Sequence, residues 1–135
     1  MTSKLVLGAR ILLGLIFFVF GLNFFFHFIP MPPMSGPPAD FAKAMAATGY
    51  LYILVKITEV TSGALLLAGR FVPLALALLA PVVVNIVAFH AFLAPAGIGL
   101  PVVILLLEIF LAWSYRAAYR PMLQAKHTAT AASSA

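Results

Sequence analysis

Long apolar runs alternate with short polar or proline-rich breaks along this chain. A helix that crosses a bilayer needs about 20 apolar residues, and four runs approach or exceed that length. We expect these spans at about residues 5–29, 50–68, 72–93 and 100–119. Glycine and proline mark the short turns between the last three runs, so consecutive helices should lie antiparallel to each other. The pattern therefore predicts an all-α fold, a four-transmembrane-helix antiparallel bundle.

The first run also has the basic start and the apolar core of a secretory signal peptide. It is longer than such a core, however, and no small-residue cleavage motif ends it cleanly. We therefore expect residues 5–29 to form the first membrane span.

The longest connection, residues 30–49, separates the first two spans. Proline cannot continue an ordinary helix, and five prolines interrupt this connection, namely Pro30, Pro32, Pro33, Pro37 and Pro38. The second half turns helical in composition, and Phe41 and Met45 lie four residues apart on one face. We expect a short interfacial helix at about residues 39–48, lying over the bundle. A plain crossover loop is the alternative.

Basic residues gather on one side of a four-span arrangement. Six lie there, namely Lys4, Arg10, Arg70, Arg116, Arg120 and Lys126, whereas the other side holds only Lys43. Membrane proteins keep lysine and arginine in their cytoplasmic loops, so we expect a multi-pass protein of the cell membrane with both termini cytoplasmic. Residues 1–123 then form a single membrane domain, and the small polar residues 124–135 indicate a disordered tail.

Composition supports the membrane class. The chain has 135 residues, of which 64% are hydrophobic and 8% are charged, whereas a soluble domain carries roughly 25% charged residues. The net charge of +5 comes from residues that flank the apolar runs. We therefore expect these basic residues to lie at the surface of a lipid bilayer. We expect no nucleic-acid partner. The chain has no cysteine, which excludes a dithiol centre, a thiolate metal site and a cysteine nucleophile.

Polar residues inside the predicted spans are the candidates for function, because a charge in the middle of a bilayer costs at least a few kcal/mol. At 1.5 Å per residue, the deeper ones fall about 9–13 Å below the outer ends of their helices, with the two histidines shallower. We expect a polar ligand-binding or proton-handling layer in the outer half of the bundle. Its candidate residues are Asn23, His27, Lys56, Glu59, Asn85, His90 and Glu108.

Two carboxylates in this layer would share one cation. Lys56 and Glu59 are three residues apart and can pair on one helix, which leaves Glu108 as a second carboxylate. Two carboxylates near one cation in a dry site do not both ionise readily, so the layer would hold a proton. Such an arrangement suits a proton relay or a quinone site. The alternative is that these side chains only tie the helices together.

Haem and metal are less favoured ligands than quinone. His27 and His90 could supply two axial imidazoles, but the chain has no c-type attachment motif. A metal site built from Glu59, Glu108 and His90 has no spacing signature to support it, so we expect no metal.

Several motifs resemble the DoxX-like family of small membrane proteins. They are Lys56-x-x-Glu59, the run SGALLLAGR at 62–70, Pro73, the run APVVVN at 80–85, His90, Tyr115-Arg116 and Arg120-Pro121. The likeness covers about residues 8–123. It implies a four-helix bundle membrane protein of bacterial type. The family's namesake is associated with a thiosulfate:quinone oxidoreductase, and other relatives with oxidative-stress complexes or membrane-protein assembly.

Three functions are compatible with this sequence. The favoured hypothesis is an accessory subunit of a membrane redox complex that is linked to quinone, with redox-complex subunits or further copies of the chain as partners. A small proton-coupled transporter is an alternative, although four spans without an internal repeat would require a dimer. A non-catalytic assembly factor or scaffold is the third. The sequence leaves open whether the chain is an enzyme, since no nucleophile–base pair, phosphate loop or zinc signature is present.

Overall fold

The computed structural model describes residues 3–130, and all regular structure in that range is helical. The elements are α1 (Lys4–Phe26), α2 (Pro37–Ala47), α3 (Leu51–Ala68), α4 (Val72–Leu93), η1 (Pro95–Gly97), α5 (Gly99–Ser114), α6 (Arg116–Tyr119) and η2 (Arg120–Leu123). No strand occurs among the described residues. The predicted all-α class is therefore confirmed.

Three helices, α1, α3 and α4, are long and apolar enough to cross a membrane. The fourth run meets that test only when α5 is taken together with Arg116–Leu123, and a bend of 73° separates these two parts. Residues 3–130 thus contain three candidate membrane helices, or four if the bent pair is one span. The run that we expected to continue to residue 119 breaks at Tyr115, whose backbone (φ −104°, ψ 19°) is not helical.

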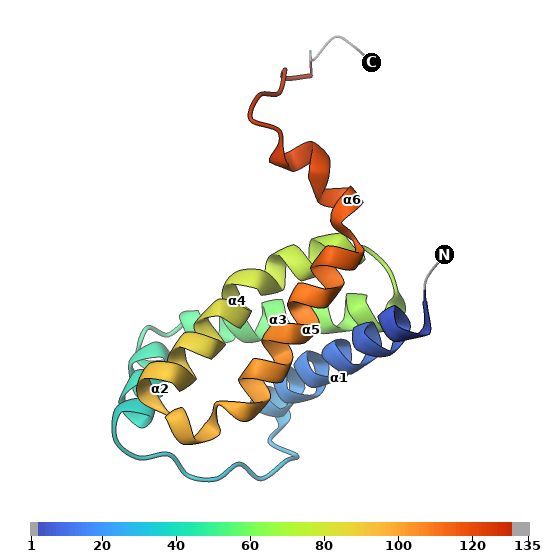
Figure 1. Ribbon diagram of the computed structural model, residues 1–135. Coiled ribbons are helices and arrows are strands. Elements are labelled where there is room, and N and C mark those ends of the chain that lie inside the picture. The colour runs from blue at the N-terminus through green and yellow to red at the C-terminus, as the bar shows by residue number, and fades with distance from the viewer. Residues whose placement is uncertain (1–2, 131–135) are drawn as a thin grey trace.

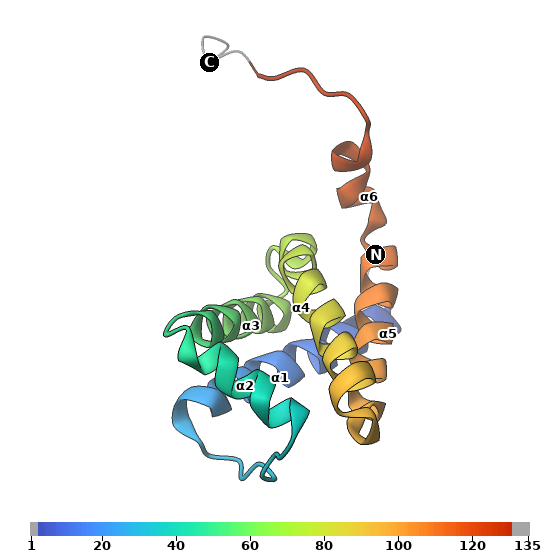
Figure 2. The same ribbon diagram turned by 90° about the vertical axis from the view of Figure 1, so that its left-hand side faces the viewer.

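The four long helices form a ring around one core. The most extensive packing joins α1 to α3; α3 also packs on α4, α4 on α5, and α5 back on α1 (Figure 1 and Figure 2). The large side chains at the centre include Leu13, Phe17, Leu66, Leu76, Leu79 and Leu111. Leucine, isoleucine and phenylalanine side chains also cover the outward faces, which is the surface that a hydrocarbon solvent requires.

Glycine allows α1 and α3 to meet backbone to backbone. A Cβ atom added at Gly63 would lie 2.6 Å from the backbone nitrogen of Phe18 and 3.0 Å from the carbonyl oxygen of Gly14. A Cβ atom at Gly14 would lie 3.1 Å from the carbonyl oxygen of Gly63. Small residues permit this close approach in membrane helix pairs, where dispersion forces replace the hydrophobic effect.

Polar side chains fasten the ends of these helices. Arg10 Nη1 donates a hydrogen bond of 2.6 Å to the carbonyl oxygen of Leu66, in the last turn of α3. The Tyr119 hydroxyl donates to the carbonyl oxygen of Pro73 at 2.6 Å, which holds α6 against the start of α4. These two bonds satisfy backbone carbonyls across elements that are far apart in the chain.

Replacing Arg10 should test the first of these hydrogen bonds. We expect Arg10→Met to lower the free energy of unfolding by about 1–2 kcal/mol, because it removes a charged donor from a helix C-terminus. Thermal unfolding in detergent would measure the loss. Lys4→Met is the control, since Lys4 is an exposed cation near the same end of α1. Equal melting temperatures for the two variants would show that the Arg10 bond contributes nothing.

The connection between α1 and α3 contains α2, as the sequence indicated. The helix spans Pro37–Ala47, close to the expected residues 39–48, and none of its residues is buried. It lies against α3 and α4, where the rings of Phe41 and Phe89 are 5.3 Å apart. In Figure 1, α2 lies at the end of the molecule away from the N-terminus.

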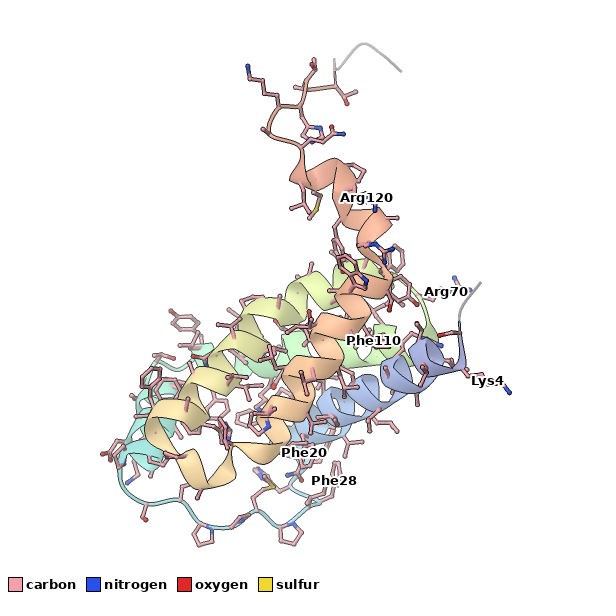
Figure 3. All side chains as sticks on the ribbon, viewed as in Figure 1. Lys4, Phe20, Phe28, Arg70, Phe110 and Arg120 are labelled. Atoms are coloured by element: carbon pink, nitrogen blue, oxygen red, sulfur yellow. The ribbon has the colours of Figure 1, made fainter. Side chains whose placement is uncertain are left out.

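Basic side chains mark the opposite end of the molecule. Lys4, Arg70 and Arg120 lie toward the end that carries the N-terminus and α6, whereas Phe20 and Phe28 lie toward the other end (Figure 3). We call the first of these the basic end. Of the predicted tail, residues 124–130 are exposed and non-helical, and residues 131–135 lie outside the described range.

Candidate functional site

Lys56 and Glu59 form an ion pair on α3. Their three-residue spacing places both on one side of the helix, and Lys56 Nζ lies 3.1 Å from Glu59 Oε2. Glu59 is only 5% exposed, so the pair keeps a buried carboxylate next to a cation. Within residues 3–130, no hydrogen bond or ion pair joins these two side chains to another helix.

Glu108 is the second buried carboxyl group, and it lacks such a partner. Its side chain is 7% exposed, and Oε1 has no hydrogen-bond partner among the described residues. No hydrogen bond or ion pair joins Glu108 to Lys56 in residues 3–130, so the expected sharing of one cation by two carboxylates is not seen. The two carboxyl groups instead have separate surroundings.

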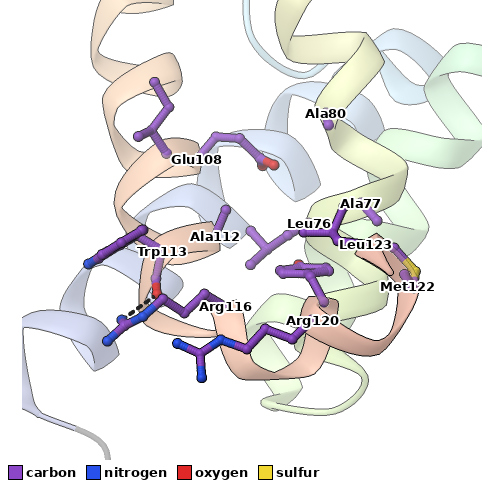
Figure 4. A pocket seen from close by; sticks show the side chains of 12 residues that line it. Leu76, Ala77, Ala80, Glu108, Ala112, Trp113, Arg116, Arg120, Met122 and Leu123 are labelled. Atoms are coloured by element: carbon purple, nitrogen blue, oxygen red, sulfur yellow. Dashed lines mark hydrogen bonds between the residues drawn. The ribbon is translucent and has the colours of Figure 1, made fainter. Parts of the chain in front are cut away.

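A cavity of about 660 Å³ lies in front of Glu108. Its walls come from α4, α5 and the bent segment Arg116–Leu123, and Figure 4 shows the Glu108 side chain directed from α5 toward α4. Most of the lining is apolar and includes Leu76, Ala77, Ala80, Ile109 and Ala112. The arrangement is therefore a hydrophobic cavity with one buried carboxyl group on its wall.

Two arginines and two aromatic residues complete the lining at the bent segment. Arg116 Nη1 donates to the carbonyl oxygen of Trp113 at 2.9 Å, and its guanidinium group lies 4.4 Å from the Trp113 ring centroid. Arg120 and Tyr119 line the same region. The tyrosine is held by its bond to Pro73, so the cations flank the cavity on an anchored segment (Figure 4).

The cavity lies toward the basic end, since Arg116 and Arg120 line it. Glu108 lies six residues, or about 9 Å, before the end of α5 at Ser114, and about 13 Å from its start. The contributing part of α4, around Leu76, is also the part that follows Arg70. On the expected span of residues 100–119, Glu108 lies in the outer half. The break at Tyr115 shortens α5 and brings Glu108 closer to its basic end.

The other candidates have local roles or face outward. The Asn23 amide accepts a hydrogen bond from the Ile29 backbone nitrogen (2.6 Å) and donates to the Ile29 carbonyl oxygen (3.2 Å), which fixes the chain where α1 ends. His27 is exposed in a left-handed backbone conformation (φ 52°). His90 Nδ1 lies 2.9 Å from the carbonyl oxygen of Ile86 on its own helix. Asn85 is exposed on α4.

In the described part of the chain, the only hydrogen bond or ion pair that joins two of the seven candidates is that of Lys56 with Glu59. Among residues 3–130, no three or more His, Cys, Asp or Glu side chains come together as a group that could hold a metal ion. Glu59, Glu108 and His90 accordingly do not form the carboxylate–histidine cluster considered from the sequence. Of the seven candidates, Glu108 lines the cavity between α4, α5 and the bent segment, and the other six do not.

Sequence reasoning missed several residues at these sites. Arg116 is three residues after Trp113, and Arg120 is four residues after Arg116. Such spacing places these basic and aromatic side chains on one side of a helix. Ser62 is fully buried three residues after Glu59, and its hydroxyl oxygen has no hydrogen-bond partner in the described chain. Helical spacing could have indicated the Trp113–Arg116–Arg120 set and the placement of Ser62 next to Glu59. It could not have indicated that Arg116 and Arg120 border a cavity.

Comparison with known proteins identifies the family. The model of the DoxX family matches residues 5–94, well over half of the chain, from α1 to the end of α4. No curated protein and no solved structure matches the chain. The match ends before α5, so it does not cover Glu108. With helices long and apolar enough to cross a bilayer, this chain belongs to the DoxX family and is a small integral membrane protein.

Proposed function

We propose that this protein is an accessory subunit of a quinone-linked redox complex, and that it binds quinone against Glu108. The observation that carries the proposal is a buried carboxyl oxygen on the wall of an apolar cavity of about 660 Å³, where no described residue forms a hydrogen bond with it. A binding site for a quinone needs apolar walls and a few polar groups that fix the head group. This cavity offers both, and its volume is in the range of small-molecule sites, about 300–1,000 Å³.

Glu108 would handle protons at this site. A protonated carboxyl group can donate a hydrogen bond to a carbonyl oxygen, and a carboxylate can accept one from a hydroxyl group. The same group can hold a proton between these states. Interconversion of quinone and quinol also moves two electrons, which a redox centre in a partner subunit would exchange. Because this chain would supply only binding and proton transfer, its role is accessory.

The membrane arrangement that we propose has four antiparallel spans, namely α1, α3, α4 and the shorter α5, which reaches the membrane surface through the bent segment that follows it. The basic end would face the cytoplasm, because Lys4, Arg70 and Arg120 gather there (Figure 3), and both termini would then be cytoplasmic. The bent segment Arg116–Leu123 would lie along that surface. It combines two arginines with the exposed side chains of Met122 and Leu123, a pattern typical of interfacial helices. On the other surface, α2 would be the interfacial helix.

Quinone retention by matched carboxyl variants tests this function. We expect wild-type protein purified in mild detergent to carry quinone, detected by mass spectrometry of its organic extract. Glu108→Gln should retain at least tenfold less, because a neutral amide cannot form the charge-assisted hydrogen bond that a carboxylate forms with a quinol hydroxyl group. Glu59→Gln is the control: it changes an equally buried carboxyl group, on α3, which does not line the cavity.

Three results would count against the proposal. They are wild-type protein without quinone, equal retention by wild type and Glu108→Gln, and equal loss from both Glu variants. A visible spectrum of the same samples would detect haem, which would redirect attention to His27 and His90.

A scaffold or assembly factor is the second candidate function. The observation in its favour is that several intramembrane polar residues make contacts that hold the fold itself, namely Asn23 with Ile29, and Lys56 with Glu59. If Glu108 were also structural, Glu108→Gln would reduce abundance and melting temperature while quinone retention stayed unchanged or absent in all samples. Proteins captured with the wild type would then be membrane assembly partners.

A further inference from the structure

The outward face of α4 carries an unpartnered amide deep within a span. Asn85 lies 13 residues after Val72, or about 20 Å along the helix, and about 12 Å before its end at Leu93. It is exposed, and its amide makes no hydrogen bond with any described residue. The neighbouring Val84 is 63% exposed, so this side of α4 faces away from the bundle.

An amide facing lipid is costly. Moving an amide from water into a hydrocarbon that cannot form hydrogen bonds costs roughly 4–8 kcal/mol. Two hydroxyl groups in other helices avoid this cost within their own helix: Thr58 donates to the Leu54 carbonyl oxygen (2.9 Å) and Ser114 to that of Phe110 (2.8 Å). Asn85 has no such bond. Its amide therefore needs a partner outside this chain.

The surface around Asn85 suits a second helix. Residues at alternating steps of four and three make one stripe along the outer side of α4: Leu74, Leu78, Pro81, Asn85, Ala88 and Phe92. Other helices leave this stripe uncovered, since all of its members are exposed except the half-buried Ala88. Pro81 and Ala88 are short on either side of Asn85, so another backbone can approach closely there. Alternating steps of four and three are also the spacing by which two helices pack along a shared seam.

We infer that two copies of this chain associate through this stripe of α4, with the two Asn85 amides paired across a two-fold axis. An amide carries a donor and an acceptor, so two copies of Asn85 can satisfy each other. In a two-fold dimer with its axis along the membrane normal, the two α4 helices run parallel, and each seam residue meets its own copy. The stripe carries no charge, so no like charges oppose each other at the contact. One polar residue in an apolar seam also fixes register.

This dimer is independent of the proposed quinone site. The cavity uses Leu76, Ala77 and Ala80 of α4, together with α5, and no member of the stripe lines it. Dimerisation can therefore fail while quinone binding holds, and the reverse. Quinone retention by a monomeric variant would separate the two proposals.

Disulfide cross-linking can test the contact, because the chain has no cysteine of its own. Single cysteines at Leu78 and Ala88 should give a covalent dimer when native membranes are oxidised. Leu106→Cys, on α5, and Ile57→Cys, on α3, are matched controls at exposed sites within other helices. We expect most of the protein to cross-link through the α4 cysteines and at most a tenth of it through the controls.

A second variant tests the amide itself. In the Ala88→Cys background, Asn85→Leu should reduce the cross-linked fraction at least fivefold, whereas Asn85→Gln, which keeps an amide, should retain most of it. Light scattering in detergent should show twice the chain mass for wild type and a larger monomer fraction for Asn85→Leu. Equal cross-linking at the α3 and α5 controls, a cross-linked band containing another protein, or full cross-linking of Asn85→Leu would overturn the inference.

Discussion

Gly63→Val should prevent most of the protein from reaching its folded state. The added Cβ alone would lie 2.6 Å from the backbone nitrogen of Phe18 and 3.0 Å from its Cα. These are backbone atoms, so no rotamer change can relieve the contact. The α1 and α3 helices would have to separate along the most extensive interface of the bundle. Overpacking a core costs about 1–3 kcal/mol and sometimes more, and here we expect at least about 3 kcal/mol.

Gly8→Val is the matched control for this prediction. Gly8 lies on α1, and a Cβ added there has nothing within 4 Å, so the variant should fold as wild type does. Gly21→Ala should be intermediate, because its new Cβ meets the side-chain Cγ2 of Val60 rather than backbone. Denaturant titration in detergent, followed by circular dichroism, would rank the three variants. If Gly63→Val proved as stable as Gly8→Val, the direct backbone contact of α1 with α3 would be wrong.

Lys56→Met should produce the second large loss of stability. It removes the cation 3.1 Å from Glu59 and leaves a carboxyl group that is 5% exposed without a charged partner. Removing one member of a buried ion pair costs about 3–5 kcal/mol, and we expect a loss near the lower limit. Protonation would remove the buried charge, so the deficit should shrink as the pH falls.

The double variant Lys56→Met/Glu59→Met distinguishes a lost partner from lost packing. Apolar residues of similar volume often replace a buried ion pair without loss, so the double variant should recover most of the stability lost in Lys56→Met. The coupling energy from the full cycle of single and double variants should be about 2–3 kcal/mol. Additive effects of the two substitutions would mean that the pair contributes little and that Lys56 stabilises the fold by packing alone.

Glu59 and Glu108 differ in their surroundings, and this difference supports a structural role for Glu59 and the proposed binding role for Glu108. Both are buried carboxyl groups within apolar helices. Glu59 has a lysine three residues earlier on the same face, whereas the positions three and four residues from Glu108 carry no charge. A group that keeps a buried, unpaired polar atom on a cavity wall is a candidate for binding or proton transfer.

Much of the helical pattern followed from the sequence alone. The expected α3 and α4 boundaries agree with the structure to within one residue, because glycines and short turns end those runs sharply. The ends of α1 and α5 do not follow from hydropathy. Asn23 binds the Ile29 backbone after α1, and Tyr119 binds Pro73 across the bundle. The first contact depends on how the backbone turns after α1, and the second joins residues 46 apart in the chain, so hydropathy reveals neither.

The sequence by itself determined the class of this protein: its apolar runs, their approximate lengths, the basic residues that flank them, and the DoxX family motifs. Only the tertiary structure decided which side of each helix faces the core. In a soluble protein, the helix side that faces water is polar and the side that faces the core is apolar, so the sequence indicates which side is which. Lipid is as apolar as a protein core, so membrane helices lose this signal. For this reason, hydropathy did not predict the cavity at Glu108 or the outward position of Asn85, and the packed structure was needed to locate both.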